Sequence, residues 1–352
     1  MSAAEPTSME RVLSALGHRE ADRVPFLINA SLHGAMSLGL SLKEYFSRSE
    51  NVVEAQLRVR EKYRHDFVMG FFYGAVDFEA WGAEVVFYDD GPPNSGEPFI
   101  KSFEQIDSLE PPVVSEAPRL RRVLKAIEML KEKVRDEVPI LGVVISPFSL
   151  PIMQMGFEKY IDLIYESPRH FDRLMAVNER FCFDWANAQI SAGATAIVYF
   201  DPVSSPTVVP REMFLEKGDP VIRRAVAGIK GPVIIHMASG RCIPIIDDLA
   251  GSGIAGIGVS ALENIGEIKA ACRGNLAVVG NLNAIEMRHW TAAEAESRVK
   301  DAIAAAGPGG GYVLSDNHGE IPLQVPEETL MAISEAVHKW GRYPLDWIEN
   351  GG

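Results

Sequence analysis

The chain has few cysteines and no long apolar run. Its 352 residues include three cysteines, which form no CxxC pair and no plausible disulfide framework, so we expect the reducing setting of the cytoplasm. No run of about 18 uninterrupted apolar residues occurs, and the first residues, MSAAEPTSMERVL, contain no apolar signal core. We therefore expect a cytoplasmic protein without a membrane partner.

Basic residues are outnumbered by acidic ones. Lys and Arg total 34 against 48 Asp and Glu, which gives a formal net charge of −14. The densest basic cluster, residues 119–125, is interleaved with leucine and valine and is typical of an amphipathic helix. An acidic chain without a basic patch repels phosphate backbones, so we expect no nucleic-acid partner.

Apolar residues make up 47% of the chain, and short apolar runs alternate with longer amphipathic stretches. Such runs are typical of strands buried on both faces of a parallel sheet. Eight are expected to be strands: 23–29, 67–73, 139–146, 194–200, 232–236, 254–259, 276–280 and 311–315. The amphipathic stretches predict helices over 51–63, 117–134, 157–192 (two or three helices), 211–229, 243–249, 291–306 and 326–339.

Eight strand–helix units predict an α/β fold, namely a (β/α)8 TIM barrel that forms one domain over residues 1–352. Two segments fall outside the eightfold pattern. Met9–Leu16 is expected to be an N-terminal helical extension, and Glu84–Ile100 is expected to be a hairpin inserted after the second strand. A doubly wound sheet with a helical cap is the alternative architecture.

Polar residues follow the predicted strands at their carboxyl ends, where barrels of this kind carry their active sites. They are Asn29, His33, Asp201, His236, Glu263, Asn281 and His318. Each one alone has an ordinary structural explanation, such as a turn, a cap or a bond to a neighbouring loop. Together, two histidines and several carboxylates at one barrel mouth fit either a metal site or a pair of acid–base groups.

The chain resembles the uroporphyrinogen decarboxylase superfamily over nearly its whole length, and particularly its cobalamin-dependent methyltransferase branch. The resemblance rests on six segments in the same order: Arg11–Pro25, Ala80–Pro93, Tyr199–Pro202, Pro232–His236, Val278–Asn283 and Gly311–Pro322. The fold of that family, a (β/α)8 barrel, agrees with the strand count.

The resemblance excludes the decarboxylase reaction on uroporphyrinogen itself. The arginine-rich motif with which those enzymes grip substrate carboxylates is replaced here by Asn29–His33. Their catalytic aspartate aligns with Tyr73 and their substrate-facing tyrosine aligns near Met153, whereas His318 matches their late histidine. We therefore expect Asn29, His33, Tyr73 and Met153 to bind a different substrate.

The relatives that methylate thiols carry zinc on an HxC pair and a late cysteine. Here His236 matches the first ligand, but Ala238 and His318 replace the two cysteines. The resemblance implies zinc near His236 and His318, and Glu263 at a neighbouring strand end is the expected third ligand. The expected catalytic residues are His318, Asp201 and Asn281 at the same strand ends, and Asp201 is also a candidate ligand or a residue that orients one. A site without thiolates is a harder Lewis acid, which suits an ether or alcohol oxygen better than a thiolate.

The expected function is methyl transfer, of the O-demethylation type, between a small methoxylated compound and a corrinoid (cobalamin) on a partner protein. Three alternatives stay open: a decarboxylase of a different small acid that uses His318 as the proton donor without a metal, a thiol methyltransferase of the coenzyme M type, and a catalytically silent binding relative.

Overall fold

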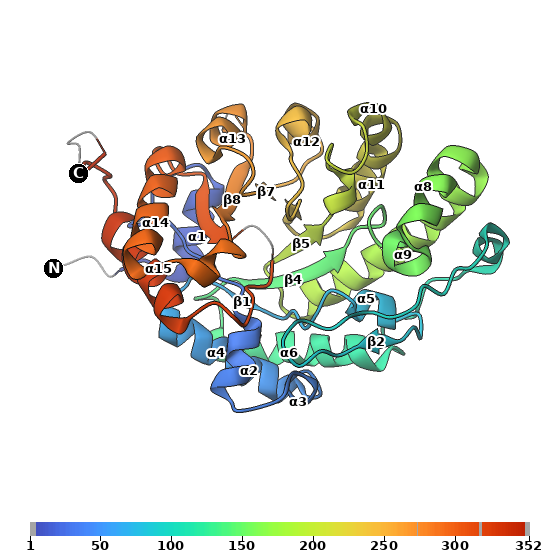
Figure 1. Ribbon diagram of the computed structural model, residues 1–352, viewed down its shortest axis with the longest axis horizontal. Helices are drawn as coiled ribbons and strands as arrows, with labels where there is room; N and C mark the ends of the chain where they lie inside the picture. Colours follow the sequence, from blue (N-terminus) through green and yellow to red (C-terminus); the bar gives the residue numbers. More distant parts are fainter. Residues whose placement is uncertain (1–4, 273, 317–318, 349–352) are drawn as a thin grey trace.

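The chain alternates between parallel strands and helices (Figure 1). The computed structural model describes residues 5–272, 274–316 and 319–348. The strands are β1 (Val68–Met69), β2 (Val85–Val86), β3 (Asn94–Ser95), β4 (Ile140–Ile145), β5 (Ala196–Phe200), β6 (Val233–His236), β7 (Gly256–Gly258), β8 (Ala277–Leu282) and β9 (Tyr312–Asp316).

The helices differ widely in length, from a single turn to 25 residues in α9. They are α1 (Ser8–Leu16), α2 (Ser31–Ser37), α3 (Leu42–Tyr45), α4 (Ser49–Tyr63), α5 (Val76–Glu79), α6 (Pro118–Val134), α7 (Pro151–Met155), α8 (Phe157–Glu166), α9 (Pro168–Ala192), α10 (Arg211–Met213), α11 (Asp219–Gly228), α12 (Ile246–Ala250), α13 (Ile265–Cys272), α14 (Ala292–Ala306) and α15 (Glu327–Trp340).

Seven of the strands form one parallel sheet, in the order β1-β4-β5-β6-β7-β8-β9, which curls into a barrel-like shape with helices around its outside (Figure 1). Each neighbouring pair is parallel, with registers such as Leu141 opposite Ala196 and Val279 opposite Val313. The parallel α/β arrangement predicted from the sequence is confirmed, and seven of the eight predicted strands form regular ladder pairs.

The first predicted strand, residues 23–29, is not a regular strand. It contributes one parallel bridge, Phe26 to Leu314, and Pro25 has no N–H to donate to a ladder. Its backbone nevertheless connects the two edges of the sheet. Leu27 N donates to Leu314 O in β9 (2.9 Å), and Asp66 N, just before β1, donates to Phe26 O (2.7 Å). The eighth position of the barrel is therefore occupied by an irregular segment.

Strand side chains alternate between two apolar clusters, as the pleat requires. On β4, Ile140 and Val144 belong to the large outer core between the sheet and the helices. Leu141 belongs to a smaller inner cluster, against which Val143 packs. Helix α1 contributes Val12 to that inner cluster, so this helix covers the amino ends of the strands.

The segments outside the barrel repeat have clear local causes. Helix α1 begins with a capping box in which Thr7 and Glu10 exchange side-chain and backbone bonds. Strands β2 and β3 form an antiparallel hairpin after β1, paired at Val85–Ser95 and Val86–Asn94. The predicted helical stretch 157–192 divides into α8 and α9 at Pro168, because proline fits the first turn of a new helix but not a helix interior.

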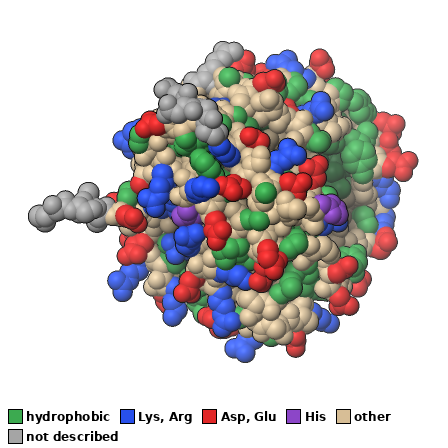
Figure 2. All heavy atoms as spheres, turned by 60° about the vertical axis from the view of Figure 1, so that its left-hand side comes forward, with side chains coloured by type: hydrophobic (Ala, Val, Ile, Leu, Met, Phe, Trp, Pro, Cys, Tyr) green, Lys and Arg blue, Asp and Glu red, His purple; other side chains and the backbone are tan. Residues whose placement is uncertain are grey.

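The outer surface carries charges of both signs. Figure 2 shows Lys and Arg side chains interspersed with Asp and Glu on one face of the molecule. Over the described residues, no helix combines the length and the apolar character that a membrane span requires.

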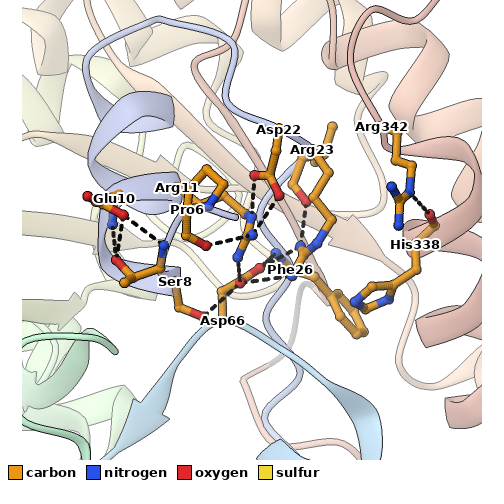
Figure 3. A network of polar contacts seen from close by, with 12 residues as sticks. Pro6, Ser8, Glu10, Arg11, Asp22, Arg23, Phe26, Asp66, His338 and Arg342 are labelled. Carbon is orange, nitrogen blue, oxygen red and sulfur yellow. Dashed lines mark hydrogen bonds and ion pairs between the residues drawn. The ribbon is translucent and has the colours of Figure 1, made fainter. Parts of the chain in front are cut away.

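A buried ion network fastens α1 and the irregular first segment to the start of β1 (Figure 3). The carboxylate of Asp66 accepts bonds from Arg11 Nη1 (2.7 Å), Arg23 Nη1 (2.7 Å), Ser8 Oγ (3.0 Å) and Phe26 N (2.8 Å). Burial opposes ionisation of Asp66, but the two arginine charges and the hydrogen bonds outweigh it and lower its pKa below 3.8.

We expect Asp66→Asn to destabilise the fold by about 3–5 kcal/mol, because it removes the carboxylate partner of buried Arg23 and one of the two carboxylates that Arg11 binds, the other being Asp22. Urea denaturation at neutral pH measures the free energy of unfolding. The control is Glu54→Gln, which removes the exposed Arg58–Glu54 pair and is expected to cost about 0.3–0.5 kcal/mol. Equal losses in the two variants would contradict this role for Asp66.

Candidate active site at the mouth of the barrel

A cavity of about 340 Å³ lies inside the curled sheet. It extends from α1 at the amino ends of the strands to the carboxyl ends, where Pro92 and Pro93 of the β2–β3 hairpin border it. Most of its lining is apolar. The polar side chains at the carboxyl end are Asn29, His236, Ser315, Asp316 and Glu320.

The charges on the cavity wall are of one sign. Asp316 and Glu320 line the cavity, and the described lining contains no Lys or Arg. Glu320 Oε1 accepts from Leu32 N (3.1 Å), and Asp316 Oδ2 accepts from Gly319 N (3.0 Å). Burial raises the pKa of Glu320 well above its usual range, and the charge of Asp316 raises it further. The described lining offers an anionic ligand no Lys or Arg as a partner.

His236 ends β6 at the cavity wall. Its Nδ1 accepts a hydrogen bond from Ala238 N (2.9 Å), so the neutral ring carries its proton on Nε2. Ala238 adopts a left-handed conformation, with φ of 50°, to make this turn. Gly258 of the neighbouring β7 leaves room for the ring, because a Cβ there would lie 2.9 Å from His236 Cδ2.

Three of the four residues expected to bind substrate line the cavity: Asn29, Tyr73 and Met153. Asn29 Oδ1 accepts from Ser31 Oγ (3.0 Å). The Tyr73 hydroxyl donates to Glu79 Oε2 (2.5 Å), and Glu79 also pairs with Arg119 (2.9 Å).

The fourth, His33, lies outside the described lining of the cavity. It is buried in α2, and its Nε2 lies 3.0 Å from Val325 O. This contact connects α2 to the segment that precedes α15.

Asp201, expected to be catalytic, is fully buried behind the cavity wall and does not belong to the described lining. Its carboxylate accepts from Ser146 Oγ (2.6 Å), Ser149 Oγ (2.7 Å) and Ser204 Oγ (2.6 Å). Burial raises its pKa, although the three hydroxyl bonds oppose that shift. In this position Asp201 joins the loop after β4 to the loop after β5.

Glu263 and Asn281 also bond to backbone rather than to the cavity. The two carboxylate oxygens of Glu263 accept from Cys242 N (2.8 Å) and Ile243 N (3.0 Å). Asn281 Nδ2 donates to Ser260 O (2.9 Å) and Glu263 O (3.0 Å). Both side chains hold the loops that follow β6 and β7.

The expected zinc ligands do not fit a zinc ion as far as the structure describes them. Nδ1 of His236 is bonded to Ala238, its Nε2 carries the ring proton, and both Glu263 oxygens cap backbone amides. The third expected ligand, His318, which is also the expected acid, lies outside the described residues. Within the described ranges, no three His, Cys, Asp or Glu side chains are placed to hold a metal ion together.

Sequence reasoning did not single out Asp77. This aspartate on α5 is buried and accepts bonds from Ile145 N (2.7 Å) and Trp185 Nε1 (3.0 Å). Burial raises its pKa to about 7, and the two bonds only partly offset that shift. The sequence signal is a carboxylate that lies between Val76 and Phe78 in the largely apolar stretch 71–81.

The fold and the cavity define an α/β barrel-type protein with its polar groups at the carboxyl ends of parallel strands. The family model for uroporphyrinogen decarboxylase (URO-D) matches residues 7–340, so the chain belongs to that family. This confirms the resemblance inferred from the motifs.

The relatives include proteins of two activities. The chain is 26% identical over 274 residues to a uroporphyrinogen decarboxylase of Idiomarina loihiensis, with 74% of each chain covered. It is 24% identical over 342 residues to the methylcobamide:CoM methyltransferase MtaA of Methanosarcina barkeri, covering 94% of this chain and 98% of the relative. A solved methyltransferase from Methanosarcina mazei shares the fold, with a TM-score of 0.84, 23% identity, and coverage of 95% and 99%.

We expect Asp77 to make stability fall as pH rises. Its pKa is about 7 in the folded chain against 3.8 as the reference, so between these values the folded state binds more protons than the unfolded state. The wild type should therefore lose stability relative to Asp77→Asn as pH rises from about 4 to about 7. Urea unfolding of both proteins at pH values across this window measures the difference; a constant difference would contradict the buried-acid state.

Proposed function

We propose that this chain transfers a methyl group between a small methylated compound and a corrinoid carried by a partner protein. The observation that carries the proposal is the cavity, whose described lining is mostly apolar and contains no Lys or Arg. A tetrapyrrole with many carboxylates needs cationic partners, of which arginine is the best suited. Of the two activities named among the relatives, methyl transfer therefore suits this cavity better.

The proposed methyl donor is a methoxylated compound rather than a methylated thiol. In the branch that methylates thiols, cysteine thiolates accompany the histidine that corresponds to His236, whereas this chain has Ala238 at the paired position. An oxygen leaving group needs a proton or a hydrogen bond more than a soft thiolate environment.

His236 has the position and the tautomer for such assistance. Because Ala238 N donates to Nδ1, a neutral His236 imidazole carries its proton on Nε2. Placed against the methyl-bearing oxygen, this N–H stabilises the negative charge that the oxygen gains as its bond to the methyl carbon breaks. The apolar lining excludes water and orients the donor, and the partner's corrinoid supplies the methyl-accepting centre when that protein docks.

The experiment is a transfer assay. The purified protein is incubated with reduced cobalamin, or with a purified corrinoid protein, and a panel of methoxylated compounds, and the absorbance change on corrinoid methylation is followed. We expect turnover with at least one methyl ether and no decarboxylation of uroporphyrinogen. Decarboxylation, or methylation of a thiol such as coenzyme M as the sole activity, would overturn the proposal.

We expect Gly258→Ala to lower kcat/KM on the order of 10- to 100-fold, because the added methyl group displaces the His236 ring and small misplacements are costly in catalysis. His236→Ala should cost about 10²–10⁴-fold, the usual value of positioned proton assistance. Both are measured in the transfer assay, after thermal unfolding has shown that the variants are folded.

The matched control is Gly91→Ala. A Cβ at Gly91 meets no atom within 4 Å, so kcat/KM should stay near the wild-type value. If Gly258→Ala behaves like Gly91→Ala, the position of the His236 ring has no part in the reaction.

A further inference from the structure

The cavity does not end at the polar mouth. It continues along the axis of the curled sheet toward the amino ends of the strands, where α1 covers it. Its walls there are Leu27, Leu141, Ala196, Val198, Ile234 and Val279. At its far end lie Val12 and Leu16, one helical turn apart on α1.

The size of this space is notable because barrels of this type are normally filled by layers of side chains. Here several inward positions hold small residues, among them Ala196, Gly258 and Ser315. A cavity of about 150 Å³ lined by apolar side chains holds benzene, and this one measures about 340 Å³. An aromatic ring with a substituent of a few atoms therefore fits inside the barrel.

The polarity of the cavity is divided along its length. The carboxylates of Asp316 and Glu320, and the imidazole of His236, lie at the mouth. Between the mouth and α1 the described lining is apolar apart from Thr195, so a charged group placed there would be desolvated without a charged partner.

We propose that this deep part of the cavity binds the uncharged, apolar body of the methyl donor, and that Leu16 and Val12 of α1 limit the length of compound that it accepts. The inference rests on the proposed function for the identity of the ligand as a methyl donor. It assigns the substrate class as neutral aryl or alkyl methyl ethers and excludes methoxylated aromatic acids. It also makes the N-terminal helix part of the binding site.

The test is direct binding to the full chain without any corrinoid, by isothermal titration calorimetry. Three probes share one ring and differ in charge: anisole, 4-methoxybenzoate and 4-methoxyphenyl-trimethylammonium. We expect anisole to bind at least about 10-fold more tightly than either ion, in keeping with the cost of burying an unpaired charge. Equal or tighter binding of the benzoate or the ammonium compound, or no binding of anisole, would overturn the inference.

Two variants test the depth of the site. Val198→Phe fills the cavity and should weaken anisole binding at least about 10-fold, because the larger side chain occupies the space in which the ring of anisole would pack. Leu16→Ala lengthens the cavity and should tighten binding of 4-butylanisole about 10-fold relative to anisole. A Leu16→Ala protein with the wild-type preference between the two ethers would show that α1 does not limit substrate length.

The matched controls are Val113→Phe and Leu262→Ala, which make the same exchanges at exposed positions outside the described lining of the cavity. Both should bind the ethers as the wild type does. The result is separable from the proposed function: ether binding without methyl transfer would overturn the function and leave the ligand class standing, and transfer from a methoxybenzoate would do the reverse.

Discussion

The barrel depends on one buried carboxylate. Asp66 binds two arginines from the first 23 residues, together with Ser8 and the backbone of Phe26, just before β1 begins. The same segment closes the ring, because Phe26 O accepts from Asp66 N and Leu27 N donates to β9. This ion network adds buried side-chain bonds to the backbone bonds Asp66 N–Phe26 O and Met9 N–Glu137 O, which also attach the first segment and α1 to the sheet. Helix α1, which covers the amino end of the cavity, is therefore held by the same ion network that joins the first segment to the sheet.

The polar residues at the strand ends form two groups: one holds loops in place, and the other lines the cavity. Asp201, Glu263 and Asn281 bond to serine hydroxyls or backbone amides and carbonyls, and so fix the loops that follow β4 to β7. His236, Asp316 and Glu320 line the cavity and determine which ligands it tolerates. The loops that the first group holds surround the mouth of the cavity. The first group therefore helps to position the side chains of the second group.

The chemistry of the cavity connects the fold to the proposed reaction. A family that includes both a decarboxylase and a methyltransferase shares one barrel, so the fold alone does not choose between them. We favour methyl transfer because the described cavity wall contains no Lys or Arg and is mostly apolar below the mouth. That combination suits an uncharged methyl donor whose leaving oxygen meets the Nε2–H of His236.

The sequence by itself determined the parallel α/β architecture, the family and most of the strands, because strands buried on both faces, such as β4 and β5, are continuous apolar runs. It also located Asn29, Tyr73, Met153 and His236, which do line the cavity. Only the tertiary structure decided that Asp201 faces three serines and that His33 faces Val325, 292 residues away. A position at the end of a predicted strand places a residue near the mouth of the barrel, but it does not determine the direction of the side chain. The direction of the side chain depends on partners from segments that are distant in the sequence. In the same way, the position of α1 at the amino end of the cavity depends on the bond between Arg11 and Asp66, which the sequence pattern does not show.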